Sequence, residues 1–137
     1  MSPPPPRYRF THAHRLHGRR AFSAVFDAKV RKNAGPLLLF TRPNARPHHR
    51  LGLSVGRRVG KAVVRSRLKR LLREAFRLTQ PGWPGGYDLV VVVRPHAPLP
   101  LPEYQRLLTQ ALLAAHRTWS KRTPPAPPPA PDPPPTS

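Results

Sequence analysis

Residues 60–77 read GKAVVRSRLKRLLREAFR and predict one amphipathic helix with two contrasting faces. At about 100° per residue, one arc is apolar and needs a protein core. It carries Val64, Leu68, Leu71, Leu72, Ala75 and Phe76. The opposite arc carries Arg65, Ser66, Lys69, Arg70, Arg73 and Arg77. Like charges spaced i, i+4 run through this arc, with only Glu74 to offset them, and cost the helix roughly 1 kcal/mol in total. Such an arrangement indicates that a polyanion lies against the helix.

Periodicity and turn residues predict elements on both sides of this helix. We expect helices over residues 19–28, 62–79 and 103–119, and strands over residues 37–41, 50–55 and 87–93. Gly35 and Pro36 are interpreted as a break in the chain. The resulting α-β-β-α-β-α order contains a β-α-β unit, so we expect its two strands to be parallel. A central sheet packed on helices gives an α+β two-layer sandwich.

Proline divides the chain into a centre and two ends. The chain has 137 residues and 22 prolines. The Pro-rich ends, residues 1–7 and 121–137, are expected to be disordered or locally polyproline II. Residues 8–120 are expected to form a single domain.

The formal net charge of +20 favours nucleic acid as the partner. A membrane surface is the alternative, but the chain lacks the apolar run of about 18 residues that a spanning helix needs. The absence of cysteine excludes disulfides and cysteine-ligated zinc. Because no apolar signal segment opens the chain, we expect a cytoplasmic protein.

Groups of residues that could support catalysis are scarce. The five acidic residues are dispersed, whereas a two-metal nuclease needs clustered carboxylates. The seven histidines have no cysteine or carboxylate nearby and predict no zinc site. A histidine pair acting as acid and base on RNA stays conceivable, although the sequence singles out none. We therefore expect no catalytic residue, no metal ligand and no cofactor in the protein itself.

Three aromatic residues, Phe22, Phe26 and Phe40, allow two interpretations. Phenylalanine is most often a core residue. In a strongly basic protein it can also form a platform on which unpaired bases stack.

Three segments resemble one known family. Residues 51–76, LGLSVGRRVGKAVVRSRLKRLLREAF, closely resemble the signature of the bacterial ribonuclease P protein subunit. Residues 19–26, RRAFSAVF, resemble its first helix, and residues 87–95, YDLVVVVRP, resemble its last strand. The resemblance covers roughly residues 15–118, and its long signature is highly specific.

The resemblance implies a rare left-handed β-α-β crossover and an accessory role in a ribonucleoprotein endoribonuclease. In this family a large RNA carries the active site and its Mg²⁺ ions, and it removes the 5′ leader from precursor tRNA. The implied partners are therefore the catalytic RNA and precursor tRNA, with no obligate protein partner. The RNA-binding residues carried over by position are Lys61, Arg65, Ser66, Arg67, Lys69, Arg70 and Arg73. Phe22, Phe26 and Phe40 would line a cleft for the single-stranded leader.

Ser66 departs from the family pattern, which usually has Asn at this position. Serine lacks the second donor and the reach of the amide, so an Asn-specific contact does not carry over from the family, whereas general phosphate binding does. The alternative to the ribonuclease P role is a structural RNA-binding protein of the ribosomal type, which takes no part in cleavage.

Overall fold

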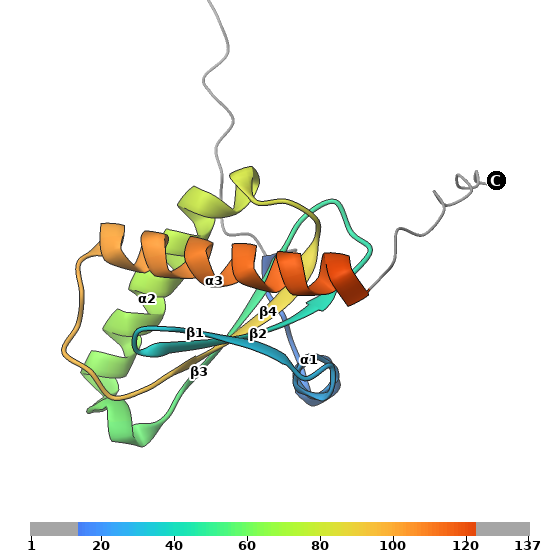
Figure 1. Ribbon diagram of the computed structural model, residues 1–137. Coiled ribbons are helices and arrows are strands. Elements are labelled where there is room, and N and C mark those ends of the chain that lie inside the picture. The colour runs from blue at the N-terminus through green and yellow to red at the C-terminus, as the bar shows by residue number, and fades with distance from the viewer. Residues whose placement is uncertain (1–13, 123–137) are drawn as a thin grey trace, which may run out of the picture.

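A computed structural model describes residues 14–122 (Figure 1). The helices are α1 (Arg19–Asp27), α2 (Ala62–Thr79) and α3 (Leu101–Arg122), with short 3₁₀ turns η2 (Arg57–Val59) and η3 (Gln80–Gly82). The strands are β1 (Val30–Ala34), β2 (Leu37–Pro43), β3 (Arg50–Val55) and β4 (Tyr87–Val93). The predicted helix over residues 62–79 is confirmed to the residue. Helix α3 runs through Arg122, two residues into the segment expected to be disordered. The rest of that segment and residues 1–7 lie outside the described residues.

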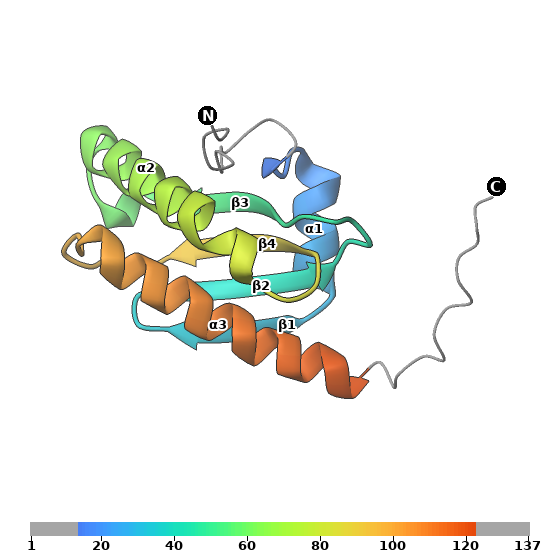
Figure 2. The ribbon, with the colours of Figure 1, turned by 90° about the horizontal axis from the view of Figure 1, so that it is seen from above.

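The strands form one mixed sheet in the order β1-β2-β4-β3. Strand β2 is antiparallel to β1 and β4, whereas β3 is parallel to β4, as predicted for the β-α-β unit. Figure 2 views the sheet from the side of α2. There β3 and β4 both run toward the left and β4 lies below β3, so β4 is on the left-hand side of β3 when the strands are followed from start to end. The crossover through α2 is therefore left-handed, against the general preference.

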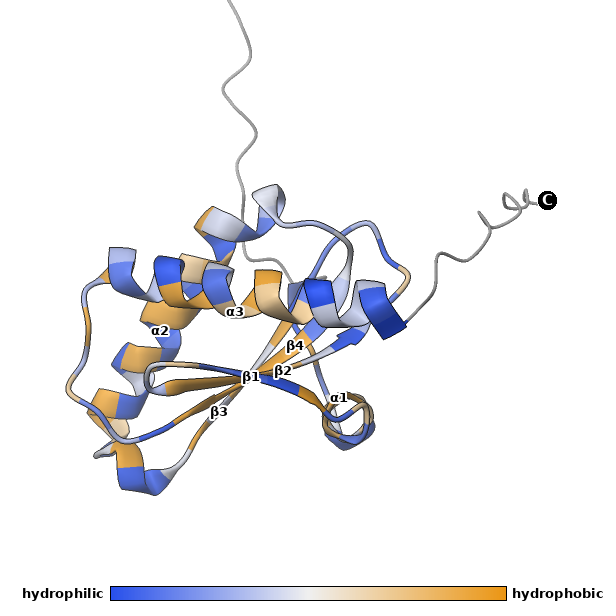
Figure 3. Ribbon diagram, in the orientation of Figure 1, coloured by the Kyte–Doolittle hydropathy of each residue, from blue (hydrophilic) through white to orange (hydrophobic). Residues whose placement is uncertain are grey.

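Helices cover both faces of the sheet (Figures 1 and 2). Helices α2 and α3 pack side by side on one face, and the main core lies between them and the sheet. There α2 buries Leu68, Leu72, Ala75 and Phe76. Helix α1 packs on the opposite face against β2 and β4, over a smaller cluster of Leu16, Val25 and Val90. The α+β class is confirmed, and α1 adds a partial third layer to the expected two. In Figure 3 the central strands β2 and β4 are mainly apolar, whereas apolar and polar residues alternate along α2 and α3.

Strand β1 was not predicted, so the order is α-β-β-β-α-β-α rather than α-β-β-α-β-α. Its sequence, VRKNA, buries only Val30 and Ala34, and the charged residues between them hide its strand character. Gly35 and Pro36 do not break the fold; they form the two-residue turn of the β1–β2 hairpin. Gly35 has φ of +56°, and proline fixes φ near −65° at the second position. This combination suits a type II′ hairpin turn.

Candidate nucleic-acid interface

The basic face of α2 points away from the main core. Lys61, Ser66, Arg67 and Arg70 are exposed, while Arg65, Lys69 and Arg73 are half-buried. The structure thus places all seven predicted RNA-binding residues on one helix and the residue before it, with their side chains accessible. None of the seven belongs to the main core.

Two of the shallow grooves along this face are lined mainly by predicted RNA-binding residues. One, of about 310 Å³, is lined by Ser66, Lys69, Arg70, Arg73 and Glu74. The other, of about 410 Å³, is lined by Ala62, Val63, Ser66, Arg67 and Arg70. Ser66 and Arg70 border both grooves, so the residue that departs from the family pattern lies at the centre of the basic face.

Not every cation of α2 is equally available. The Nε of Arg77 donates a hydrogen bond to Glu74 at 2.9 Å, and this ion pair partly neutralises the C-terminal end of the face. Arg65 donates from its Nε to the carbonyl oxygen of Gly60 at 3.2 Å. Partial burial lowers the pKa of Arg73, and the positive charge of Arg15 lowers it further. Arginine nevertheless stays protonated in proteins, so Arg73 keeps its charge.

The three predicted leader-cleft residues come together on the sheet face that α1 covers, which we call the α1 face. Phe26 and Phe40 pack edge to face, with ring centroids 4.7 Å apart. The ring of Phe22 lies directly on Gly52, where a Cβ would come within 2.5 Å of its tip. All three are half-buried against the cluster of Leu16, Val25 and Val90, which we call the minor core. Each therefore packs in the minor core and keeps part of its ring accessible.

Strand register shows residues of the α1 face that sequence reasoning missed. The first row across the sheet is Arg31, Phe40, Val90 and Gly52, and α1 packs over it. The second row is Asn33, Leu38, Val92 and Ser54. Its apolar members are half-buried, and its polar members at the two ends are exposed. The second row therefore extends the surface beside the phenylalanines. Side chains alternate between the two faces along each strand, but this alternation identifies the second row only once the strand register is known.

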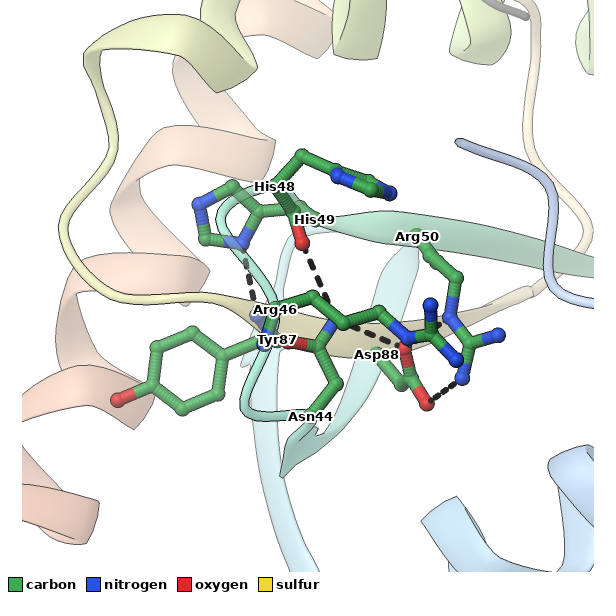
Figure 4. Close-up of polar contacts among 7 residues, drawn as sticks. All are labelled: Asn44, Arg46, His48, His49, Arg50, Tyr87 and Asp88. Atoms are coloured by element: carbon green, nitrogen blue, oxygen red, sulfur yellow. Dashed lines mark hydrogen bonds and ion pairs between the residues drawn. The ribbon is translucent and has the colours of Figure 1, made fainter. Parts of the chain in front are cut away.

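A polar network fixes the other end of the α1 face (Figure 4). Arg50 donates to both carboxylate oxygens of Asp88, at 2.7 and 2.6 Å. Asn44 donates to Asp88 at 3.0 Å and to the carbonyl oxygen of His48 at 3.1 Å. The carboxylate raises the pKa of Arg50. These bonds join the loop between β2 and β3 to β4, and so hold the start of β3 in register.

His49 is buried in the same loop and is held neutral. Its Nδ1 accepts a hydrogen bond from the backbone N–H of Tyr87 at 3.0 Å, and its ring stacks on that of Tyr87 (Figure 4). Burial lowers its pKa to about 4. The Tyr87 hydroxyl lies 2.7 Å from Nδ1 of His116. His49 thus supports the core rather than an exposed reaction site. Within residues 14–122, no three acidic or histidine side chains gather closely enough to hold a metal ion.

The sequence model of the family described as Ribonuclease P matches residues 10–116. The chain belongs to the ribonuclease P protein family. It is 38% identical over 108 residues to the ribonuclease P protein component of Desulfovibrio desulfuricans, covering 77% of this chain and 83% of that protein. It is 52% identical over 77 residues to that of Azotobacter vinelandii. This second match covers 55% of the present chain and spans a little over half, 58%, of the relative.

Solved structures of ribonuclease P proteins share the fold. The protein from Thermotoga maritima is 31% identical, with a TM-score of 0.65, covering 72% of this chain and 94% of that one. The Staphylococcus aureus protein is 26% identical, with a TM-score of 0.64, covering 74% and 94%. In this ribonuclease P family member, no helix of the described residues is long and apolar enough to cross a membrane.

Proposed function

We propose that this chain is the protein component of ribonuclease P and that it binds the catalytic RNA through the basic face of α2. The observation that carries the proposal is the set of accessible cations on one helix, from Lys61 to Arg73, in a family member. Arginine suits this role because its planar guanidinium makes two parallel hydrogen bonds to a phosphate. The structural RNA-binding alternative has no observation of its own in its favour.

The second part of the proposal concerns precursor tRNA. The single-stranded leader would lie on the α1 face, against Phe22, Phe26 and Phe40 and along the second row. Half-buried aromatic rings beside accessible cations combine stacking with charge, as single-stranded nucleic acid requires. The rings keep fixed positions because each is anchored in the minor core.

The protein is proposed to assist cleavage rather than perform it. Mg²⁺ would belong to the RNA of the holoenzyme, with no cofactor in the protein itself. Two of the protein's own carboxylates, Asp88 and Glu74, are engaged with arginines and serve structure. A cytoplasmic location follows from the proposal, since the proposed RNA partners are made there.

Reconstitution tests the proposal. The full chain is mixed with a bacterial ribonuclease P RNA at low Mg²⁺, and cleavage of a 5′-labelled precursor tRNA is followed. We expect the protein to stimulate cleavage well above RNA alone and to be inactive without RNA. Cleavage by the protein alone, or no stimulation of the RNA, would refute the proposed role. A variant with Arg67 and Arg70 replaced by Ala should need a higher protein concentration for the same stimulation.

A further inference from the structure

A third groove lies at the outer edge of the sheet, where β3 meets α1 and α2. It has a volume of about 170 Å³. Phe22 and Gly52 form one side, and Arg15, Lys69 and Arg73 bring three cations to it. The groove therefore adjoins both the leader-binding surface and the basic face of α2.

Backbone pairing holds Arg15 at this place. The N–H of Leu16 donates to the carbonyl oxygen of Leu51 at 3.0 Å, and Arg15 pairs with Leu51 in a parallel bridge. The segment before α1 is thus attached to the edge of β3 (Figure 2). Arg15 is positioned by the fold rather than carried on a loose arm.

The charges around the groove favour the binding of an anion. None of the described residues that line it is acidic. Arg73 is partly desolvated and lies close enough to Arg15 for the two charges to repel. Lys69 and Arg73 are half-buried and Arg15 is exposed, and three cations gathered at one groove attract an anion. A phosphate oxygen pair matches the fork of a guanidinium.

The size of the groove limits the ligand. Its volume is several times the share of one water, about 30 Å³, and below that of pockets for drug-sized molecules, about 300–1,000 Å³. One phosphodiester with its sugar suits this space, whereas a double helix does not. The ring of Phe22 beside it offers a stacking surface to the adjoining base.

We propose that this groove binds one phosphodiester of a single-stranded RNA whose neighbouring base lies against Phe22, with Arg15, Lys69 and Arg73 as its ligands. The proposal rests on the proposed leader binding by Phe22. Lys69 and Arg73 also border the 310 Å³ groove on the basic face of α2, so the two RNA-binding surfaces are continuous through these residues. The leader and an unpaired stretch of the catalytic RNA share this chemistry, and the experiment separates them.

The test compares Arg15→Ala with Arg117→Ala, which removes the same charge from the exposed side of α3. Each full-length variant is titrated at several salt concentrations against a single-stranded leader oligonucleotide and, separately, against the catalytic RNA. We expect Arg15→Ala to lower the affinity for one of the two RNAs about tenfold. The slope of log affinity against log salt concentration for that RNA should become smaller by about 0.7–0.9, the change for one lost phosphate contact. Arg117→Ala should change both affinities less than twofold. A loss confined to the oligonucleotide assigns the groove to the leader, and a loss confined to the catalytic RNA assigns it there.

A double-mutant cycle tests whether Arg15 and Arg73 share one phosphate. The effect of Arg15→Ala should be clearly smaller in the Arg73→Ala background, because residues that bind one group are not additive. Additive losses, or equal behaviour of Arg15→Ala and Arg117→Ala in both titrations, would overturn the proposal. Unchanged thermal melting of each variant excludes unfolding as the cause. If the wild-type protein itself fails to distinguish precursor from mature tRNA, the proposed leader function fails instead.

Discussion

Replacing Phe22 by Ala should separate leader binding from all other RNA contacts. Phe22 is half-buried, with its ring lying on Gly52. Stacking of one base on an aromatic side chain contributes about 1–3 kcal/mol, which corresponds to a loss of about 5- to 150-fold in affinity. Mature tRNA has no leader, so its affinity should stay the same.

The stability cost of Phe22→Ala must be measured alongside. A fully buried Phe→Ala change costs about 3–5 kcal/mol. Because Phe22 keeps part of its surface exposed, we expect about 1–2 kcal/mol. The melting temperature should therefore fall by several degrees, and binding is best measured well below it.

A second variant tests the same position without removing the ring. In Gly52→Ala the new Cβ would lie 2.5 Å from the tip of Phe22, so the ring must recede by about 1 Å to reach ordinary carbon contact distance. Precursor binding should then fall by less than in Phe22→Ala, while the fold persists. Leu113→Ala, on the exposed side of α3, is the control and should change neither affinity nor specificity.

The assay is competition binding of precursor and mature tRNA to the reconstituted holoenzyme. Phe22→Ala should reduce the ratio of the two affinities, and Gly52→Ala should reduce it partly. An equal loss for precursor and mature tRNA would refute the reasoning and return Phe22 to a purely structural role.

Four further predictions concern the basic face and the polar network. If six cations of α2 and its preceding loop each meet a phosphate, affinity for the catalytic RNA should fall by about 10³ between 50 and 200 mM salt, and a flat titration would contradict the charge argument. Replacing Arg67 and Arg70 by Ala should lower the affinity for the catalytic RNA at least about tenfold, and the melting temperature should stay the same or rise. A large loss of stability would show that the two residues are structural. Asp88→Ala leaves Arg50 without its carboxylate. Chemical denaturation should show that the free energy of unfolding falls by about 2–3 kcal/mol, which is less than for a fully buried ion pair because Arg50 is partly exposed. The lowered pKa of His49 means that its stabilising contribution is complete above pH 6.5 and is lost as pH falls toward about 4, by up to about 3 kcal/mol. Denaturation across this range should show the decline, and His49→Gln should flatten it.

Much of the fold was predictable because its central elements have strong periodic patterns. Helix α2 combines an apolar stripe with a polar face, and β4 is a run of β-branched residues, so both were predicted with their correct bounds. Strand β1 was missed because only two of its residues are buried and it contains Arg31 and Lys32. Strand β1 forms because the turn at Gly35 and Pro36 pairs it with β2, and its own residues do not predict this pairing.

The candidate site was predictable only in part, for a similar reason. The cations of α2 lie next to each other along one helix, so their spacing alone predicts a shared face. The second row and the groove at Arg15 join residues far apart in the sequence, through a sheet register that no local pattern specifies. Gly52 illustrates this: within its strand it reads as a small residue, and only the ring above it explains why a side chain is absent.

The hand of the β3-α2-β4 crossover decides which face of the sheet the long helices leave uncovered. For two adjacent parallel strands, reversing the hand moves the connecting helix to the other face of the sheet. A right-handed crossover would have placed α2 over Gly52 and Val92, and its bulk would have sealed the second row. With the rarer hand, both long helices share the burial of one face, and the opposite face needs only the short α1 as cover. The uncommon chirality thus leaves the second row of the α1 face accessible beside a cationic helix, whereas the mirror-image connection would have buried it.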